Sequence, residues 1–93
     1  MATRYTFSTQ RADGQLVNLW TSAAPGERSL ITQASNELDQ DLSEDAERKG
    51  TPLSTAAPNV RILDRDPLRV YFEVSEPDRM VRIIGFQKIP ATP

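Results

Sequence analysis

The chain has 93 residues, with no cysteine, no histidine and a formal net charge of −2 at pH 7. This length suits one small domain, which its apolar core must stabilise because disulfides and thiolate metal sites are excluded. The lack of histidine also excludes Ser-His-Asp and Cys-His catalysis and histidine-bound zinc, so we expect neither a metal nor a cofactor.

The distribution of apolar and charged residues indicates whether the protein is soluble, secreted or in a membrane. No stretch approaches the roughly 20 apolar residues of a membrane-spanning helix, and residues 1–7 lack the apolar core of a signal peptide. We therefore expect a soluble, cytoplasmic protein. Residues 1–47 carry a net charge of −5 and residues 48–93 a net charge of +3, an asymmetry that suits a partner neutralising the positive half.

The N-terminal half of the chain predicts one strand and two helices. Tyr5 and Phe7 alternate with polar residues, which predicts a strand over residues 4–8. Apolar residues at helical spacing then predict a helix over residues 9–22 with Thr9 as its N-cap. This stripe consists of Ala12, Leu16, Leu19 and Trp20. The helical spacing favours a core position for Trp20 over a role in binding.

A second helix follows a short connector, with Pro25 as its expected first residue. Its apolar stripe consists of Leu30, Ala34, Leu38 and Leu42, with Ile31 beside it. The helix is expected to end either near Ser43 or at Arg48–Lys49, with Gly50 as its C-terminal cap. Two helices joined in this way should form an antiparallel hairpin.

The C-terminal third predicts a three-stranded antiparallel meander after a polar loop over residues 51–58. Pairing Leu63 with Arg69 sorts the first two strands into two faces. The apolar face holds Val60, Ile62, Val70, Phe72 and Val74, and the opposite face holds Arg61, Leu63, Arg69, Tyr71 and Glu73. Residues 80–88 are apolar on both sides (Val81 and Ile83; Ile84 and Phe86), which predicts an interior strand or a second face that meets a partner.

Together these elements predict an α+β fold. An N-terminal strand and a two-helix hairpin precede the meander, and the hairpin covers the apolar face of the sheet. Residues 1–93 form a single domain in this interpretation, and residues 90–93 are expected to be a flexible tail.

Three passages carry a resemblance to a known family. Leu16-Val-Asn-Leu-Trp20 resembles the end of that family's first helix, and Leu42–Gly50 resembles the close of its second helix, with Ala46 in place of a proline. Pro67–Val74 and Val81–Phe86 resemble its core strands. The family is the RelE/ParE superfamily, the toxins of bacterial toxin–antitoxin modules, and its short plasmid stabilisation proteins are the most similar group.

The resemblance implies a toxin held by an antitoxin, whose extended segment wraps the toxin's helices and sheet. Ribonucleases of the family cut messenger RNA on the ribosome, using basic residues of the open sheet face and a C-terminal tyrosine. The candidate catalytic residues here are Arg61, Arg69, Tyr71 and Lys88. The candidate nucleic-acid-binding residues are Arg61, Arg69, Arg82 and Lys88.

The match to the ribonucleases is incomplete. Phe72 stands where the strand motif has its second tyrosine, and Ile62 and Ile89 occupy expected basic positions. The sequence ends at Pro93 without the helix that carries the family's tyrosine. The resemblance therefore predicts a protein without an intact nuclease site.

Apart from the resemblance, the chemistry of the candidate residues allows more than one role for each. Arg61 and Arg69 could bind phosphate, although pairing with Glu73 or another acid is favoured. Tyr71 could stack on a base or act as a general acid, although packing beside Arg61 is favoured. The acids from Glu37 to Glu47 spread around their helix, which favours a solvated face over a metal site.

We predict a toxin-family protein that binds an antitoxin and a cellular target, and we do not expect an enzyme. The first alternative is a ribosome-dependent messenger-RNA endoribonuclease that uses the candidate residues above. The second is a non-toxic protein-interaction module.

Overall fold

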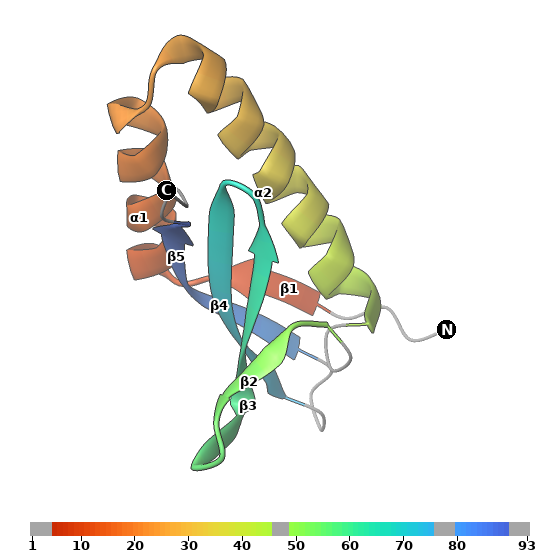
Figure 1. Ribbon diagram of the computed structural model, residues 1–93. Coiled ribbons are helices and arrows are strands. Elements are labelled where there is room, and N and C mark those ends of the chain that lie inside the picture. Colours follow the sequence, from red (N-terminus) through yellow and green to blue (C-terminus); the bar gives the residue numbers. More distant parts are fainter. Residues whose placement is uncertain (1–4, 46–48, 76–79, 90–93) are drawn as a thin grey trace.

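The computed structural model describes residues 5–45, 49–75 and 80–89. Two helices and a five-stranded sheet make up this part of the chain (Figure 1). In chain order they are β1 (Tyr5–Ser8), α1 (Gln10–Ser22), α2 (Pro25–Asp45), β2 (Thr51–Ser54), β3 (Ala57–Arg65), β4 (Leu68–Ser75) and β5 (Met80–Lys88). This order confirms the α+β class and the predicted succession of strand, helices and strands. The expected tail at residues 90–93 lies outside the described residues.

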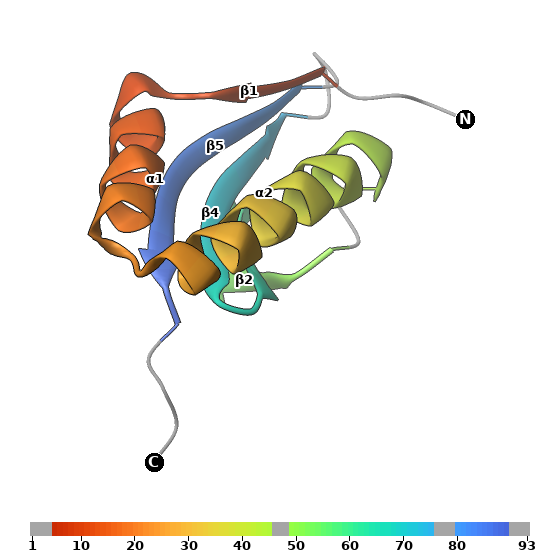
Figure 2. The ribbon, with the colours of Figure 1, turned by 90° about the horizontal axis from the view of Figure 1, so that it is seen from above.

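Local sequence explains where the helices begin and end. The Thr9 hydroxyl oxygen accepts a hydrogen bond from the Ala12 N–H at 3.1 Å, so Thr9 is the N-cap of α1, as predicted. Pro25 is the first residue of α2, where its missing N–H leaves no helical bond unmade. α2 is described as far as Asp45, two residues beyond the shorter expected end at Ser43, and Arg48 of the longer expected end lies outside the described residues. The helices run in opposite directions and diverge from their connector (Figures 1 and 2).

The core forms where α2 meets one face of the sheet, called here the helix face. Its sheet members are Leu68, Val70, Phe72, Val74, Val81, Ile83 and Phe86, and its helix members are Ala12, Ile31, Ala34, Leu38 and Leu42. α1 packs along β5 and adds Leu16 and Leu19 to the margin of this cluster. The predicted cover of the apolar face by the hairpin is therefore confirmed. The opposite side of the sheet is called the open face.

Leu30, predicted for the core stripe of α2, is 55% exposed, and Ile31 beside it is buried. A helix has 3.6 residues per turn, so a strict four-residue repeat drifts by about 40° at each step. The stripe that begins at Ile31 stays on one side as far as Leu42, whereas Leu30 lies beyond its border.

The strands are ordered β1-β5-β4-β3-β2. β1 runs parallel to β5, and the other neighbours are antiparallel. β2 corrects the prediction of a loop over residues 51–58, because Thr51 and Pro52 pair with Ile62 and Arg61 of β3. Proline has no N–H to donate, so a strand that contains it suits the edge of a sheet, where β2 lies.

The register between β3 and β4 differs by one residue from the predicted one. Leu63 lies opposite Val70 instead of Arg69. Because partners in an antiparallel pair share a face, Leu63 belongs to the helix face and packs against the core. Ile62, predicted for that face, lies opposite Tyr71 on the open face.

The same shift moves Val60 to the open face and places Arg61 on the helix face, opposite Phe72. The Arg61 guanidinium donates to the backbone carbonyl oxygens of Lys49 and Gly50, at 2.8 and 2.9 Å. Burying a charge is costly mainly when its hydrogen bonds are unmade. The pattern of apolar residues alone favours the predicted register, in which Arg61 lies on the open face. That pattern takes no account of the backbone carbonyls that bind Arg61 on the helix face.

A β-bulge interrupts the pairing of β4 and β5 at Ile84. Beyond this extra residue, Phe86 returns to the helix face that Val81 and Ile83 occupy, so its predicted place on the opposite face is wrong. The Phe86 N–H at the bulge donates to Oε1 of Gln15 in α1, at 2.9 Å. The predicted interior position of the strand is confirmed, because β5 lies between β1 and β4.

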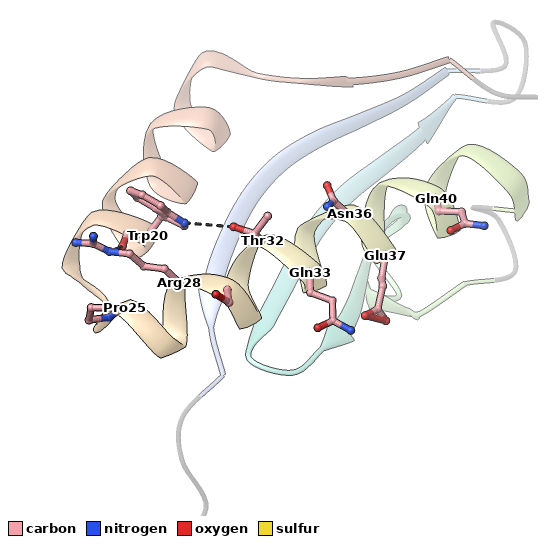
Figure 3. A pocket seen from close by; sticks show the side chains of 9 residues that line it. Trp20, Pro25, Arg28, Thr32, Gln33, Asn36, Glu37 and Gln40 are labelled. Atoms are coloured by element: carbon pink, nitrogen blue, oxygen red, sulfur yellow. Dashed lines mark hydrogen bonds between the residues drawn. The ribbon is translucent and has the colours of Figure 1, made fainter.

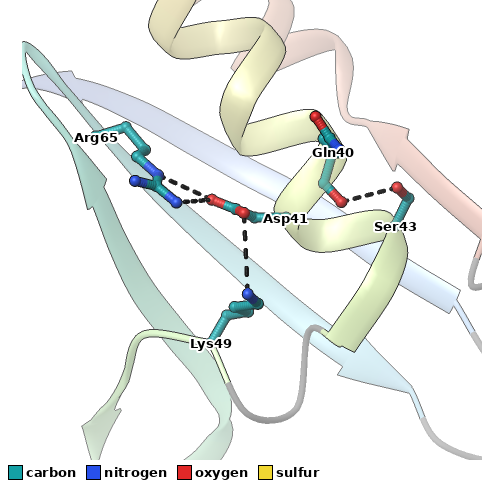
Figure 4. Close-up of polar contacts among 5 residues, drawn as sticks. All are labelled: Gln40, Asp41, Ser43, Lys49 and Arg65. Atoms are coloured by element: carbon teal, nitrogen blue, oxygen red, sulfur yellow. Dashed lines mark hydrogen bonds and ion pairs between the residues drawn. The ribbon is translucent and has the colours of Figure 1, made fainter.

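Asp41 links the C-terminal half of α2 to β3 (Figure 4). Its carboxylate pairs with Arg65 of β3 at 2.9 Å and with Lys49 at 3.9 Å. The hydrogen bond from Arg65 and the attraction between the two charges raise the pKa of the Arg65 guanidinium. This member of the acidic run therefore serves to hold the fold together.

Candidate functional site

Two of the four cationic residues named as candidates from sequence lie on the helix face. Arg61 is held by the backbone carbonyls described above. Lys88, opposite Leu68 at the end of β5, has its Nζ 2.7 Å from the Glu27 carboxylate at the start of α2. Arg61 therefore connects β3 to the segment that enters β2, and Lys88 connects β5 to α2.

The other two, Arg69 and Arg82, lie on the open face, each beside an acid. Arg69 Nε is 2.8 Å from the Asp64 carboxylate, and Arg82 Nη2 is 2.8 Å from the Glu73 carboxylate. The hydrogen bond and the charge of Asp64 raise the pKa of Arg69, so its guanidinium stays protonated. The pairing of Arg69 with an acid matches the interpretation that the sequence favours. The same interpretation is wrong for Arg61, whose partners are backbone carbonyls instead of a carboxylate.

Tyr71 lies on the open face, where its hydroxyl donates to Gln87 Oε1 at 2.7 Å. Its neighbour on β3 is Ile62, which corrects the predicted packing beside Arg61. Arg69, Tyr71 and Arg82 thus share one face, whereas Arg61 is on the other. The structure does not bring the four candidate catalytic side chains together.

Among the cations in the described part of the chain, Arg11 alone has neither a hydrogen bond nor an ion pair. It lies in the first turn of α1, beside a shallow hollow of about 410 Å³ that Gln15, Tyr71 and Gln87 also line. One unpaired arginine and neutral polar groups can contact an anion, but they supply no general base.

Arg61→Ala should lower the free energy of unfolding by about 1.5–3 kcal/mol, because it removes charge-assisted hydrogen bonds to two carbonyls. Arg82→Ala is the matched control, since Arg82 is exposed and pairs only with Glu73, an interaction worth about 0–1 kcal/mol. Urea denaturation of both variants makes the comparison. Equal, small losses would contradict the structural role assigned to Arg61.

Within residues 5–45, 49–75 and 80–89, no group of three or more acidic side chains gathers closely enough to hold a metal ion. No helix in those ranges is long and apolar enough to cross a membrane.

The clearest surface feature that sequence reasoning missed is on the helical hairpin. Trp20, predicted for the core, is 41% exposed. Its indole Nε1 donates to the Thr32 hydroxyl at 3.3 Å, and the Arg28 guanidinium lies 4.6 Å above its ring centre (Figure 3). The sequence did carry one indication that Trp20 is exposed, because this residue lies at the margin of the apolar stripe and in the last turns of α1.

No protein-family model and no curated protein sequence matches the chain. Solved structures do match it. The RelBE2 toxin–antitoxin complex of Mycobacterium tuberculosis contains a chain that is 18% identical, with a TM-score of 0.75, over 95% of this chain and 93% of that one. The chromosomal ParDE system of Pseudomonas aeruginosa gives 19% identity and a TM-score of 0.71, over 95% and 98% of the two chains.

A doubly substituted Escherichia coli RelE toxin in the free state gives 15% identity and a TM-score of 0.65, over 94% of this chain and 84% of that one. Agreement over nearly the whole chain at such low identity is agreement of backbone architecture. The resemblance noted from sequence is therefore confirmed at the level of the fold.

Proposed function

We propose that this chain, which has the RelE/ParE toxin fold, is the toxin-type member of a bacterial toxin–antitoxin module. In this proposal an antitoxin binds it, and its effect on the cell comes from binding a target rather than from cutting RNA. The observation that carries the proposal is the combination of the fold with the placement of the candidate cations. They are divided between two faces of the sheet, and each is occupied by a carbonyl or a carboxylate of the same chain.

The chemistry of RNA cleavage supports the non-catalytic part of the proposal. Attack by a ribose 2′-hydroxyl is assisted by a base for its proton and a cation for the phosphate, and general acid–base help is worth about 10²–10⁴-fold. Arginine stays protonated and cannot serve as the base. Tyr71 already donates its hydroxyl hydrogen to Gln87, and Asp64 already neutralises the nearby Arg69.

We expect no cleavage of ribosome-bound messenger RNA above background, either by the wild-type protein or by its Arg69→Ala variant. The measurement is mapping of RNA ends after incubation with programmed ribosomes, with an active ribosome-dependent ribonuclease as the positive control. Robust cutting that Arg69→Ala abolishes would overturn the non-catalytic proposal in favour of an endoribonuclease.

The toxin–antitoxin part of the proposal has a separate test. Induced expression of the chain in a bacterial host should arrest growth, and co-expression of a small protein encoded beside it should restore growth and co-purify with it. Unchanged growth under strong, soluble expression would contradict a toxin and favour a non-toxic interaction module.

A further inference from the structure

The shallow hollow beside Arg11 lies where α1 packs along β5, on the side of the open face. Arg11 and Gln15 line it from α1, Tyr71 from β4, and residues 84–87 from β5. Arg11 and Gln15 are four residues apart on a helix, so they are neighbours on one side of α1. The volume of about 410 Å³ leaves room for a charged group together with the atoms that carry it.

The bulge of β5 forms the floor of this hollow. Ile84 has no partner on β4, and Gly85 after it lies opposite Tyr71. A Cβ at Gly85 would lie 3.1 Å from the Gln15 side-chain oxygen and 3.7 Å from the Tyr71 ring. The depth of the hollow therefore depends on the absence of a side chain at residue 85. Bulges are frequent beside functional sites, and glycine inside a strand often marks a place where a ligand approaches the backbone.

The side-chain groups left for a ligand in this hollow are chiefly hydrogen-bond donors. Gln15 Oε1 accepts from the Phe86 N–H at 2.9 Å, and this contact fixes the orientation of the amide because a backbone N–H can only donate. Gln87 Oε1 accepts from the Tyr71 hydroxyl at 2.7 Å. Each glutamine is therefore left with its NH₂ group. Arg11 keeps its whole guanidinium, since it has no partner in the described part of the chain.

The charge of the hollow favours an anion with a single charge. Among the described residues that line it, Arg11 alone is charged. A carboxylate carries one negative charge, and its two oxygens match the parallel N–H groups of a guanidinium. A nucleic-acid strand gains its affinity from several phosphate contacts, but Arg69 and Arg82 of the open face are already paired with acids. One free cation therefore favours a carboxylate over a nucleic acid.

We infer that this hollow binds a carboxylate carried by an apolar group, as in an N-acylated amino acid or at the C-terminus of a peptide. Arg11 binds the two carboxylate oxygens, and the NH₂ groups of Gln15 and Gln87 donate to them. The apolar group lies against Ile84 and the ring of Tyr71, which are half-buried. This inference goes beyond the proposed function and does not depend on it, because every test below uses the purified protein and a defined ligand.

The first experiment titrates the ¹⁵N-labelled protein with N-acetylleucine, in a buffer that contains no other carboxylate and no phosphate. The nuclear magnetic resonance signals of the Arg11 Nε–H and of the Gln15 and Gln87 NH₂ groups should shift together and saturate with one dissociation constant. N-acetylleucinamide, which has a neutral amide in place of the carboxylate, should bind at least about tenfold more weakly. Absence of saturation with the acid, or equal binding of the acid and the amide, would overturn the inference.

Further ligands distinguish the possible sources of the carboxylate. A tetrapeptide that ends in leucine should bind more tightly than N-acetylleucine if the site takes the end of a chain, and no more tightly if it takes a small acid. A single-stranded oligonucleotide should compete weakly, with a log–log salt slope of about −0.7, as for one phosphate contact. Competition by the oligonucleotide at a lower concentration than the peptide would point to a nucleic acid and overturn the inference.

A pair of isosteric variants locates the binding. Gln87→Glu places a carboxylate of the protein in the hollow that Arg11 lines, and it should weaken binding of N-acetylleucine at least about tenfold. Gln33→Glu makes the same chemical change at an exposed residue of α2 and should leave binding unchanged. Both glutamines are exposed, so neither variant should unfold the protein. Equal losses would show a response to net charge alone and would contradict a site in the hollow.

The role of Arg11 is tested by removal of its charge. Arg11→Gln should lower the affinity for N-acetylleucine at least about tenfold, because no other lining residue is charged. Arg11→Lys should recover part of this loss, since it keeps the charge but not the planar fork of the guanidinium. Arg65→Gln, at an exposed arginine opposite Leu68 on the helix face, is the matched control and should bind as the wild-type protein does. Undiminished binding by Arg11→Gln, or an equal loss in Arg65→Gln, would overturn the inference.

Discussion

Replacing Leu38 by alanine is expected to lower the free energy of unfolding by about 2–5 kcal/mol. Leu38 is 1% exposed and belongs to the core between α2 and the sheet. The shorter side chain leaves a cavity among the closely packed side chains of this core. Chemical denaturation followed by far-ultraviolet circular dichroism measures the loss.

Leu30→Ala is the matched control, since it makes the same chemical change on the same helix at a residue that is 55% exposed. Its effect should stay within about 0.5 kcal/mol, as for most surface substitutions. Similar losses for the two variants would contradict the packing of α2 on the sheet described above.

Gly50→Ala is expected to cost about 2–4 kcal/mol, for two reasons that add. Gly50 has a φ of 67°, in the left-handed region that residues with a Cβ rarely adopt. A Cβ there would also overlap the backbone carbonyl oxygen of Ile62 and lie 2.8 Å from its carbonyl carbon. Neither backbone can move freely, because Arg61 binds the Gly50 carbonyl and β3 is paired on both sides.

Gly26→Ala provides the control, because a Cβ at Gly26 meets no atom within 4 Å and the residue lies in the first turn of α2. This substitution should be neutral or raise stability by up to about 1 kcal/mol. Thermal unfolding of both variants gives the comparison. A Gly50→Ala protein as stable as Gly26→Ala would show that the chain enters β2 by a different path.

The elements of the fold could be predicted because each depends on a short-range pattern. Thr9 caps the helix that follows it, Pro25 begins the next, and Leu38 and Leu42 mark the buried side of α2. Helical and strand periodicity express contacts within a few residues, so the sequence carries them directly.

The register of β3 could not be predicted by the same means. The register depends on where Arg61 finds hydrogen-bond acceptors. These acceptors are the backbone carbonyls of Lys49 and Gly50, which precede Arg61 in the chain by 12 and 11 residues. Backbone carbonyls are present at every residue, so no side-chain pattern marks the two that Arg61 uses. The bulge at Ile84 could not be predicted for a similar reason. The Phe86 N–H beside the bulge donates to the Gln15 side chain, which lies 71 residues earlier in the chain.

The candidate site was predictable in part. Patterning identified Arg69 and Tyr71 as neighbours on the open face, and the pairing of arginines with acids follows from the abundance of both. The separation of Arg61 from them is a consequence of the register. The exposed position of Trp20 was missed although this residue lies at the margin of the α1 stripe.

The parallel pairing of β1 with β5 has a consequence for synthesis of the protein. β5 is the last of the described strands to leave the ribosome, yet it lies inside the sheet, with β1 on one side and β4 on the other. Until then β1 has no neighbour and Phe72 lacks Ile83 beside it. The sheet is therefore completed only after translation of residue 88, and a product truncated before Met80 loses the middle of its sheet rather than an edge. Premature termination before Met80 should accordingly leave chains that cannot form this sheet.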